Sequence, residues 1–338
     1  MITDKLIKIK QLGIIGSICT FKRMLVSKKN ANWINDNRPL YNQLIDVDSK
    51  KAQGIFWKAV YGKSFPWNNP VTLNEKIIWL SAMTDTSKWT EYSDKYEVRK
   101  YIESLGLKDI LTECYGVWDS IDDVDFNSLP DTFVIKCTHD CGSTIIVKDK
   151  GQIDVNQVKK FLNDHLKERY GYQFCEPHYT KIKPRVMAEG YINELGSENS
   201  SFKSHSSVDY KIWCLNGKAE WVFVCYDRYL DSEEEHGAVF DIYDVIKWIP
   251  MRQYLSDSYK NVVFKDVPRP KNLEMMVEIA EKISTGFPQV RVDLYNVNGK
   301  IYFGEMTFTS QGGRMSYYTE EFQKMMGEKV DISEYMKK

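Results

Sequence analysis

Two segments of the sequence alternate apolar and polar residues on either side of an Asn-Gly pair, a pattern that is typical of tight β-hairpins. One segment covers residues 291–308, RVDLYNVNGKIYFGEMTF, and the other covers residues 209–228. The two strands of a hairpin run antiparallel. The chain is therefore expected to contain antiparallel sheet, which argues against a doubly wound parallel architecture.

Shorter strand patterns and amphipathic helical patterns alternate with these hairpins. Helical spacing of apolar residues covers 93–105, 155–170 and 273–284, and strand-like runs cover 132–136, 144–148 and 185–192. Residues 1–70 are expected to be helical and irregular, without recognisable chemistry. Strand pairs and helices in this mixed order predict an α+β fold.

The hairpin at 291–308 carries two carboxylates whose relative position depends on the length of its turn. A two-residue turn at Asn298-Gly299 would pair Asp293 with Gly304 and put Glu305 on the opposite face. A three-residue loop, or a bulge, would place Asp293 directly opposite Glu305. The two-residue turn is the commoner of the two, so a shared site needs one of the less common arrangements.

Facing carboxylates on this hairpin would point to a bound cation. Like charges directly opposite each other destabilise a strand pair, and a cation between them removes that penalty. Mg²⁺ prefers a few carboxylate oxygens together with nucleotide phosphates, and the neighbouring Arg291 could hold a phosphate or an oxyanion. The alternative is a solvated hairpin with scattered charge.

Composition narrows the classes of function. The 338 residues carry a formal net charge of -1, so no bulk electrostatic attraction to nucleic acid is expected. Seven Cys at irregular spacing form no CxxC pair, which favours reduced thiols in a cytoplasmic protein. No signal peptide is evident. The apolar run at 12–21 is too short to span a bilayer. It is expected to form a helix packed on its own domain. Because basic residues surround it, a helix that docks on a membrane or partner is the alternative.

The hairpin motif R-x-D followed by E-x-T resembles the metal-binding end of ATP-grasp ligases, and several further stretches resemble the TupA-like ATP-grasp family of teichuronopeptide and capsule biosynthesis. Together they span about residues 70–315 in the expected order. The stretches are LNEKIIWL (73–80), SDKYEVRKYI (93–102), FVIKCTH (133–139), EPHYTKIKPRVMAEGYI (176–192), DYKIWCLNG (209–217) and RVDLYNVNGKIYFGEMTF (291–308).

The resemblance implies an ATP-grasp fold, in which two α+β subdomains sandwich ATP. It implies a helical N-terminal region over 1–70, an ATP-grasp domain over 71–325 and a C-terminal tail over 326–338. The nucleotide would lie between about 130–192 and 209–313.

The resemblance also assigns roles to individual residues. ATP contacts are implied for nine residues: Lys95, Lys136, His139, Gly142, Ser143, Ala188, Glu189, Tyr191 and Glu194. The two lysines would contact the phosphates, and the backbone from Ala188 to Tyr191 would contact adenine. Glu189 or Glu194 would contact the ribose. Mg²⁺ ligands would be Asp293, Glu305 and Thr307, and catalytic contacts are implied for Arg291, Lys211 and Arg228. For His139, a hydrogen-bonded structural role is the alternative. For Lys211 and Arg228, surface ion pairs are the alternative.

The chain departs from the family pattern at two places. The phosphate loop reads His139-Asp140-Cys141-Gly142-Ser143, where the family has His-Gly-Ser-Gly. Asp140 and Cys141 are less permissive in backbone than glycine, and an acid beside phosphates is repulsive. We therefore expect impaired loop closure or weaker ATP binding. Thr307 stands where wider ATP-grasp enzymes have Asn, and its single oxygen can still coordinate a metal.

The implied function is an ATP- and Mg²⁺-dependent carboxylate–amine ligase that forms an amide through an acyl phosphate. The implied substrates are a uronic-acid carboxylate of a glycan and an amino acid or other amine, in surface polysaccharide biosynthesis, with a possible peripheral membrane or glycan-assembly partner. The alternatives are an ATP-dependent sugar kinase and a non-catalytic nucleotide-binding scaffold.

Overall fold

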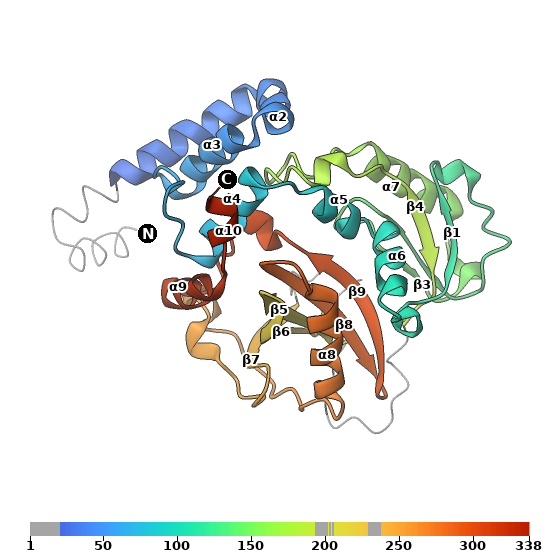
Figure 1. The fold of residues 1–338 in the computed structure, drawn as a ribbon. Helices are drawn as coiled ribbons and strands as arrows, with labels where there is room; N and C mark the ends of the chain where they lie inside the picture. The colour runs from blue at the N-terminus through green and yellow to red at the C-terminus, as the bar shows by residue number, and fades with distance from the viewer. Residues whose placement is uncertain (1–20, 193–201, 203, 205, 229–237, 338) are drawn as a thin grey trace.

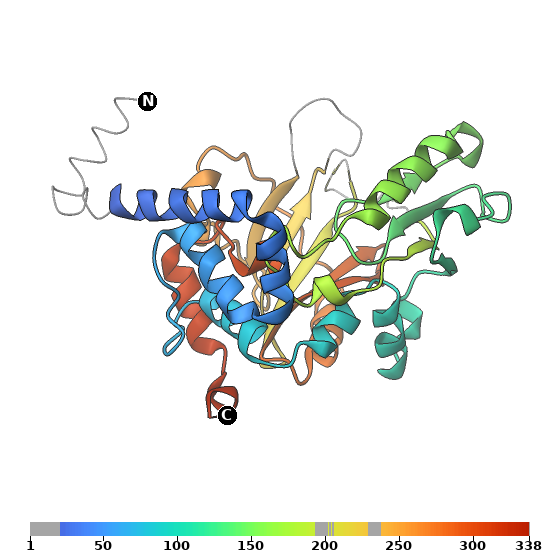
Figure 2. The same cartoon turned by 90° about the horizontal axis from the view of Figure 1, so that it is seen from above.

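Two antiparallel sheets with helices packed against them make up the protein. The computed structural model describes residues 21–192, 202, 204, 206–228 and 238–337. The sheets lie side by side, and the helices of the first 70 residues gather at one end (Figures 1 and 2). The predicted α+β fold is confirmed.

The larger sheet has five strands in the order β7-β6-β5-β8-β9. Its strands are β5 (Asp209–Leu215), β6 (Lys218–Tyr226), β7 (Val239–Asp244), β8 (Gln289–Val297) and β9 (Lys300–Thr307). Both predicted hairpins are present as β5–β6 and β8–β9. Each turns through an Asn-Gly pair with positive φ at both residues, 53° and 86° at Asn298 and Gly299, which is the turn geometry that matches strand twist.

The smaller sheet has four strands in the order β1-β4-β2-β3. They are β1 (Cys114–Trp118), β2 (Phe133–Cys137), β3 (Ile145–Val147) and β4 (Val186–Glu189). Helix α7 (Val155–Lys167) packs on this sheet and shares its hydrophobic core. It ends three residues before the predicted end at 170, because Glu168 already has an extended backbone (ψ 131°).

The remaining helices connect and cover the sheets. They are α4 (Leu73–Met83), α5 (Ser87–Ser93), α6 (Glu97–Ser104), α8 (Leu273–Ser284), α9 (Glu320–Lys329) and α10 (Ser333–Met336). Short 3-10 turns occur at Lys108–Ile110, Ile121–Asp123, Lys150–Gln152, Tyr179–Lys181, Arg252–Tyr254, Asp257–Tyr259 and Ser310–Gly313. Helix α4 begins with a capping box, in which the Thr72 hydroxyl accepts from the Glu75 amide and the Glu75 carboxylate accepts from the Thr72 amide.

The N-terminal region consists of a helix over 21–36, α2 (Arg38–Val47) and α3 (Ser49–Tyr61). The first helix packs tightly on the end of α3, where a Cβ added to Gly62 would lie 2.1 Å from the carbonyl oxygen of Arg23. Apart from its last residue, the apolar run at 12–21 lies outside the described residues. No described helix is both long and apolar enough to cross a membrane.

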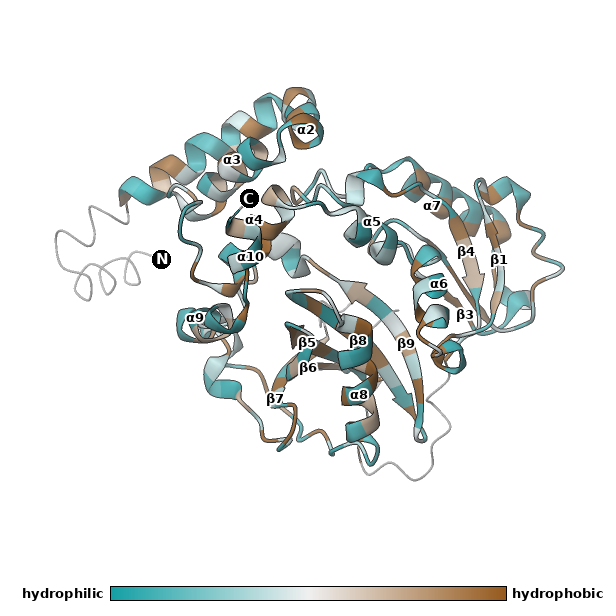
Figure 3. Cartoon of the chain, viewed as in Figure 1, coloured by the Kyte–Doolittle hydropathy of each residue, from teal (hydrophilic) through white to brown (hydrophobic). Residues whose placement is uncertain are grey.

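Buried hydrophobic residues form cores between the sheets and their covering helices, and Figure 3 colours each residue of the chain by its hydropathy. The largest core lies around the five-stranded sheet and includes the stacked pair Trp213 and Trp221, with ring centroids 5.2 Å apart. Residues 326–332, expected to begin a C-terminal tail, contribute Met326, Val330 and Ile332 to this core. This segment is therefore packed against the body of the protein.

Candidate active site

The β8–β9 hairpin places Asp293 directly opposite Glu305. The turn has two residues, and the pairing shifts by one between Asp293 and Leu294, so Gly304 forms a bulge. A Cβ added to Gly304 would lie 3.1 Å from the Asp293 carbonyl oxygen. The bulge, rather than a longer turn, brings the two carboxylates to the same place.

Arg291 lies between these carboxylates. Its guanidinium donates to Asp293 at 2.6 and 2.8 Å, to Glu305 at 3.1 Å and to the Thr307 hydroxyl at 2.9 Å. A fifth hydrogen bond, of 2.8 Å, reaches the Ser310 hydroxyl. The arginine thus gathers the hairpin's polar side chains and offsets the repulsion between the two acids.

A second cation approaches the same site from the neighbouring strand β5. The Lys211 ammonium lies 2.5 Å from carboxylate oxygens of both Asp293 and Asp209, and Arg228 lies 3.6 Å from Asp209. Burial would lower the pKa of Lys211, but the two carboxylates raise it, so the lysine stays charged. Burial alone would raise the pKa of Asp293, but Arg291 and Lys211 hold it below its usual range.

The chemistry of this donor set suits Mg²⁺. Asp293, Glu305 and Thr307 offer hard oxygen ligands, and 43% of the Glu305 side chain is exposed to solvent. The side chains of Asp293 and Arg291 are almost fully enclosed, at 3% and 10% exposed. Because the carboxylates already share two internal cations, a metal here would compete with Arg291 for Glu305.

Lys136 extends from β2 of the smaller sheet and forms an ion pair with Glu189 of β4. Glu189 also accepts a hydrogen bond of 2.7 Å from Thr112 and lies 3.6 Å from Arg99. Burial would raise the pKa of Glu189, but Lys136 first, and then Thr112 and Arg99, lower it. In this arrangement the Glu189 carboxylate orients Lys136, and its contact with ribose stays a prediction.

The expected adenine-binding segment follows the same strand. Ala188 is fully buried in β4, between Gly116 of β1 and Ile135 of β2. Its backbone lies within the sheet, so adenine contacts are expected from Tyr191 and its neighbours beyond the strand. Glu194 lies outside the described residues.

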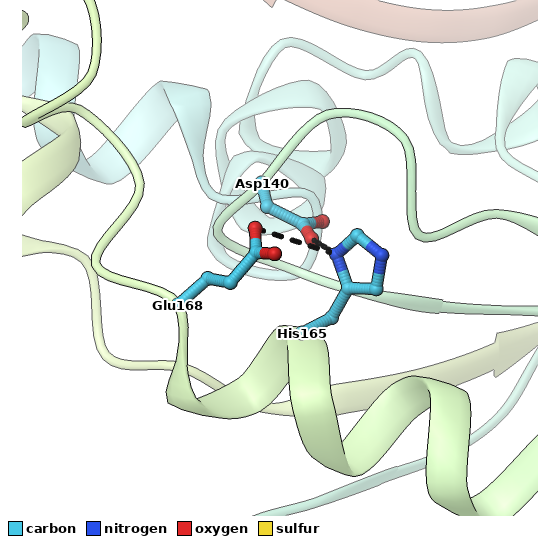
Figure 4. Close-up of side chains that lie close together, drawn as sticks. All are labelled: Asp140, His165 and Glu168. Carbon is cyan, nitrogen blue, oxygen red and sulfur yellow. Dashed lines mark hydrogen bonds and ion pairs between the residues drawn. The ribbon is translucent and has the colours of Figure 1, made fainter.

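The expected phosphate loop joins β2 to β3, and its acid is turned into the protein (Figure 4). Asp140 is 1% exposed; one carboxylate oxygen lies 2.5 Å from the Ser143 hydroxyl and the other lies 2.7 Å from Nδ1 of His165. The Glu168 carboxylate lies 3.8 Å from the same nitrogen. The Asp140 carboxylate is thus buried and hydrogen-bonded within the protein, and its effect on a bound phosphate stays a prediction.

The other loop residues support its shape. The Ser143 hydroxyl accepts from the Cys137 amide at 2.9 Å, and Gly142 has a φ of 108°, a conformation that favours glycine. The Lys95 ammonium donates to the Asp140 carbonyl, so this lysine reaches the loop. His139 is 2% exposed and its Nε2 lies 3.3 Å from the Glu168 carbonyl oxygen, which favours the structural role for this histidine.

The loop and the hairpin approach each other across the two sheets. Partial desolvation raises the pKa of the Cys141 thiol, and the next largest cause is the Glu305 carboxylate. Lys95 and Lys211 act on the same thiol in the opposite direction. A single site shared by the loop and the hairpin stays a prediction.

Sequence reasoning missed two polar residues of this site. Asp209 is 4% exposed and shares Lys211 with Asp293; its position two residues before Lys211 on one strand, and so on the same face, could have revealed it. Ser310 contacts Arg291 from a 3-10 turn after β9, and no periodicity in the sequence indicated that contact.

Comparison with protein families identifies the family of the chain. The family model described as TupA-like ATPgrasp matches residues 75–331. The chain belongs to the TupA-like ATP-grasp family. No curated relative matches the sequence.

Solved ATP-grasp ligases resemble this TupA-like chain only distantly. D-alanine–D-alanine ligase from Bacillus anthracis, complexed with ATP, is 12% identical, with 70% of this chain and 61% of that chain covered and a TM-score of 0.38. L-amino acid ligase from Bacillus licheniformis is also 12% identical, with 80% and 57% covered and a TM-score of 0.45. The match therefore spans less than two thirds of either solved chain.

Proposed function

We propose that this TupA-like protein is an ATP- and Mg²⁺-dependent ligase that joins a carboxylate to an amine as an amide. The observation that carries the proposal is the pairing of Asp293 with Glu305 by the Gly304 bulge, with Arg291 between them. Two carboxylates and a guanidinium in one cluster suit phosphoryl transfer, which depends on positioning and neutralisation of charge. A purely structural hairpin has no need of this buried cluster.

The phosphates of ATP would lie between the two sheets. Lys95 and Lys136 would hold the α- and β-phosphates, and the loop at His139, Gly142 and Ser143 would close over them. Asp293, Glu305 and Thr307 would hold Mg²⁺, which would supply positive charge to the phosphates of ATP. Adenine would meet Tyr191 and its neighbours beyond β4, and Glu189 or Glu194 would meet the ribose.

The chain's own cations would handle the carboxylate substrate. Arg291 would hold the acyl phosphate and stabilise the negative charge that develops when the amine attacks it. For this role the guanidinium has to release Glu305, which lies at 3.1 Å and is the longest of its contacts with the hairpin's carboxylates. Lys211 would keep Asp293 ionised, and Arg228, 43% exposed, would face the acidic substrate.

We further propose that the carboxylate belongs to a uronic acid of a surface polysaccharide and that the amine is an amino acid or a related compound. The six described cysteines are free thiols, which is consistent with a cytoplasmic reaction, possible at the inner face of the membrane. This substrate pair rests on the family's association with teichuronopeptide and capsule biosynthesis.

Product analysis tests the proposal. The purified protein is incubated with ATP, Mg²⁺, glucuronate or galacturonate, and a panel of amino acids, and products are separated by mass. A ligase yields an amide with ADP and phosphate in equal amounts. A phosphosugar with ADP would instead identify a sugar kinase, and the absence of turnover with every pair, despite ATP binding, would favour a scaffold.

A further inference from the structure

Positive charge is concentrated in the N-terminal region. Residues 1–70 contain twelve Lys and Arg against four Asp and Glu, a formal net charge of +8. Because the whole chain carries -1, residues 71–338 carry -9. The overall charge therefore conceals a basic region and an acidic body, and the basic region complements an anionic partner.

A groove of about 490 Å³ lies in this basic region, where the helix at 21–36, the beginning of α3 and the loop at 62–70 meet. We call it the Trp67 groove. Its main lining residues are Asn30, Lys50, Lys51, Lys58, Phe65 and Trp67. None of the residues that we assign to the nucleotide or the metal lines it, so the groove is separate from the ligase site.

Three lysines of the Trp67 groove have no anionic partner within the described part of the chain. Lys50, Lys51 and Lys58 form no ion pair with any described carboxylate, whereas Lys136, Lys211, Lys218 and Lys329 each have one. The groove's single carboxylate, Asp48, caps α3 by accepting from the Lys51 amide at 3.0 Å. The three ammonium groups are thus available to a ligand.

The position of two of these lysines is unfavourable without an anion. Lys50 and Lys51 lie in the first turn of α3, where the helix dipole disfavours positive charge and favours negative charge. A bound anion would offset this cost and would meet the same helix end. The local electrostatics therefore favour an anionic ligand in the groove.

An aromatic surface lies beside the lysines. The half-buried ring of Trp67 packs on Phe65, with centroids 4.2 Å apart, and the Lys50 ammonium lies 5.4 Å from the Trp67 ring centre. Gly54 faces the same ring and has no side chain to cover it. The apolar face of a pyranose can pack on such a ring while its acidic group meets the lysines.

We propose that the Trp67 groove binds a uronic-acid saccharide, a part of the acceptor glycan other than the reacting sugar. This proposal rests on the proposed function, from which the acidic glycan is taken. The groove would hold a polymeric or lipid-linked acceptor on the enzyme and raise the local concentration of its reacting carboxylate. An anionic membrane is the competing partner. The exposed Phe21, Met24 and Leu25 on the helix at 21–36 lie outside the groove and would serve that partner instead.

Direct binding tests the proposal with the full chain. An oligogalacturonide is titrated into the wild type and into Trp67→Ala and Lys50→Gln/Lys51→Gln variants by calorimetry, with an uncharged maltooligosaccharide as the matched ligand. The control variant Lys28→Gln/Lys29→Gln removes the same charge from the same region outside the groove. We expect the acidic oligosaccharide alone to bind, both groove variants to bind about tenfold more weakly, and the control to bind like the wild type.

Several results would overturn the proposal. An equal loss of oligogalacturonide affinity in the control and the groove variants would show that overall charge alone explains the binding. Equal binding of the uncharged maltooligosaccharide would show that the lysines do not recognise the ligand. Absence of oligogalacturonide binding, or binding only to vesicles containing anionic lipid, would also reject it. ATP binding, measured in the same samples, separates this proposal from the proposed function, because groove variants should keep the wild-type affinity for ATP.

Discussion

Glu176 is a buried acid whose replacement should change how the stability of the protein depends on pH. It is 3% exposed and accepts a hydrogen bond of 2.5 Å from Thr309, two residues after strand β9. Burial raises its pKa from 4.5 to about 7, and the effects of Thr309 and Arg314 offset this only in part. Between pH 4.5 and about pH 7, Glu176 is therefore protonated in the folded protein and ionised in the unfolded chain.

The sign and size of the effect follow from this difference. Stability from the protonated Glu176 is fully present below pH 4.5 and is lost as pH rises to about 7. At about 1.4 kcal/mol per pH unit, the loss amounts to about 3 kcal/mol. Glu176→Gln keeps the acceptor for Thr309 and cannot ionise, so it should be more stable than the wild type above pH 7 and similar to it near pH 4.5.

Urea unfolding at several pH values between 4.5 and 8 measures this prediction. The difference in free energy of unfolding between Glu176→Gln and the wild type should grow with pH and level off above about pH 7. Glu278→Gln, at an exposed position on α8, is the matched control and should show no such trend. A pH-independent difference between Glu176→Gln and wild type would refute the reasoning.

Three further substitutions test the geometry of the site. His165→Ala should expose the Asp140 charge to the phosphates and weaken ATP binding about tenfold. Adding Asp140→Asn to this variant should restore ATP binding. Calorimetry measures the affinity for ATP of the single and the double variant. Lys211→Met should lower the free energy of unfolding by about 3–5 kcal/mol, because it removes the cation that the buried Asp209 and Asp293 share; an unchanged urea midpoint would contradict this. Gly304→Val should disrupt the bulge and weaken Mg²⁺-dependent ATP binding about tenfold, whereas unaltered binding would show that the bulge does not set the register.

The sequence predicted those elements whose signals are local. Asn-Gly pairs between alternating strands identified both hairpins, and the apolar spacing of residues 273–284 matches α8 residue for residue. Local turn geometry and periodicity are properties of a few consecutive residues, so they can be recognised without knowledge of the fold.

Features that depend on distant contacts were not predictable in the same way. The turn length alone gave the wrong pairing for Asp293, because the bulge at Gly304 restores the register; a glycine inside a strand was the available sign. The environment of Asp140 depends on His165, which is 25 residues away on another element. Its effect on phosphate could therefore not be inferred from the loop sequence.

Binding of ATP with and without Mg²⁺ tests the central claim most directly. Calorimetry compares the wild type with Asp293→Asn/Glu305→Gln and with the control Asp164→Asn/Glu278→Gln, which makes the same chemical changes at exposed positions. The account predicts Mg²⁺-dependent binding to the wild type and the control, and binding at least about tenfold weaker in the hairpin variant. Equal Mg²⁺-dependent affinity in all three proteins would show that the β8–β9 hairpin does not hold the metal and would contradict the account.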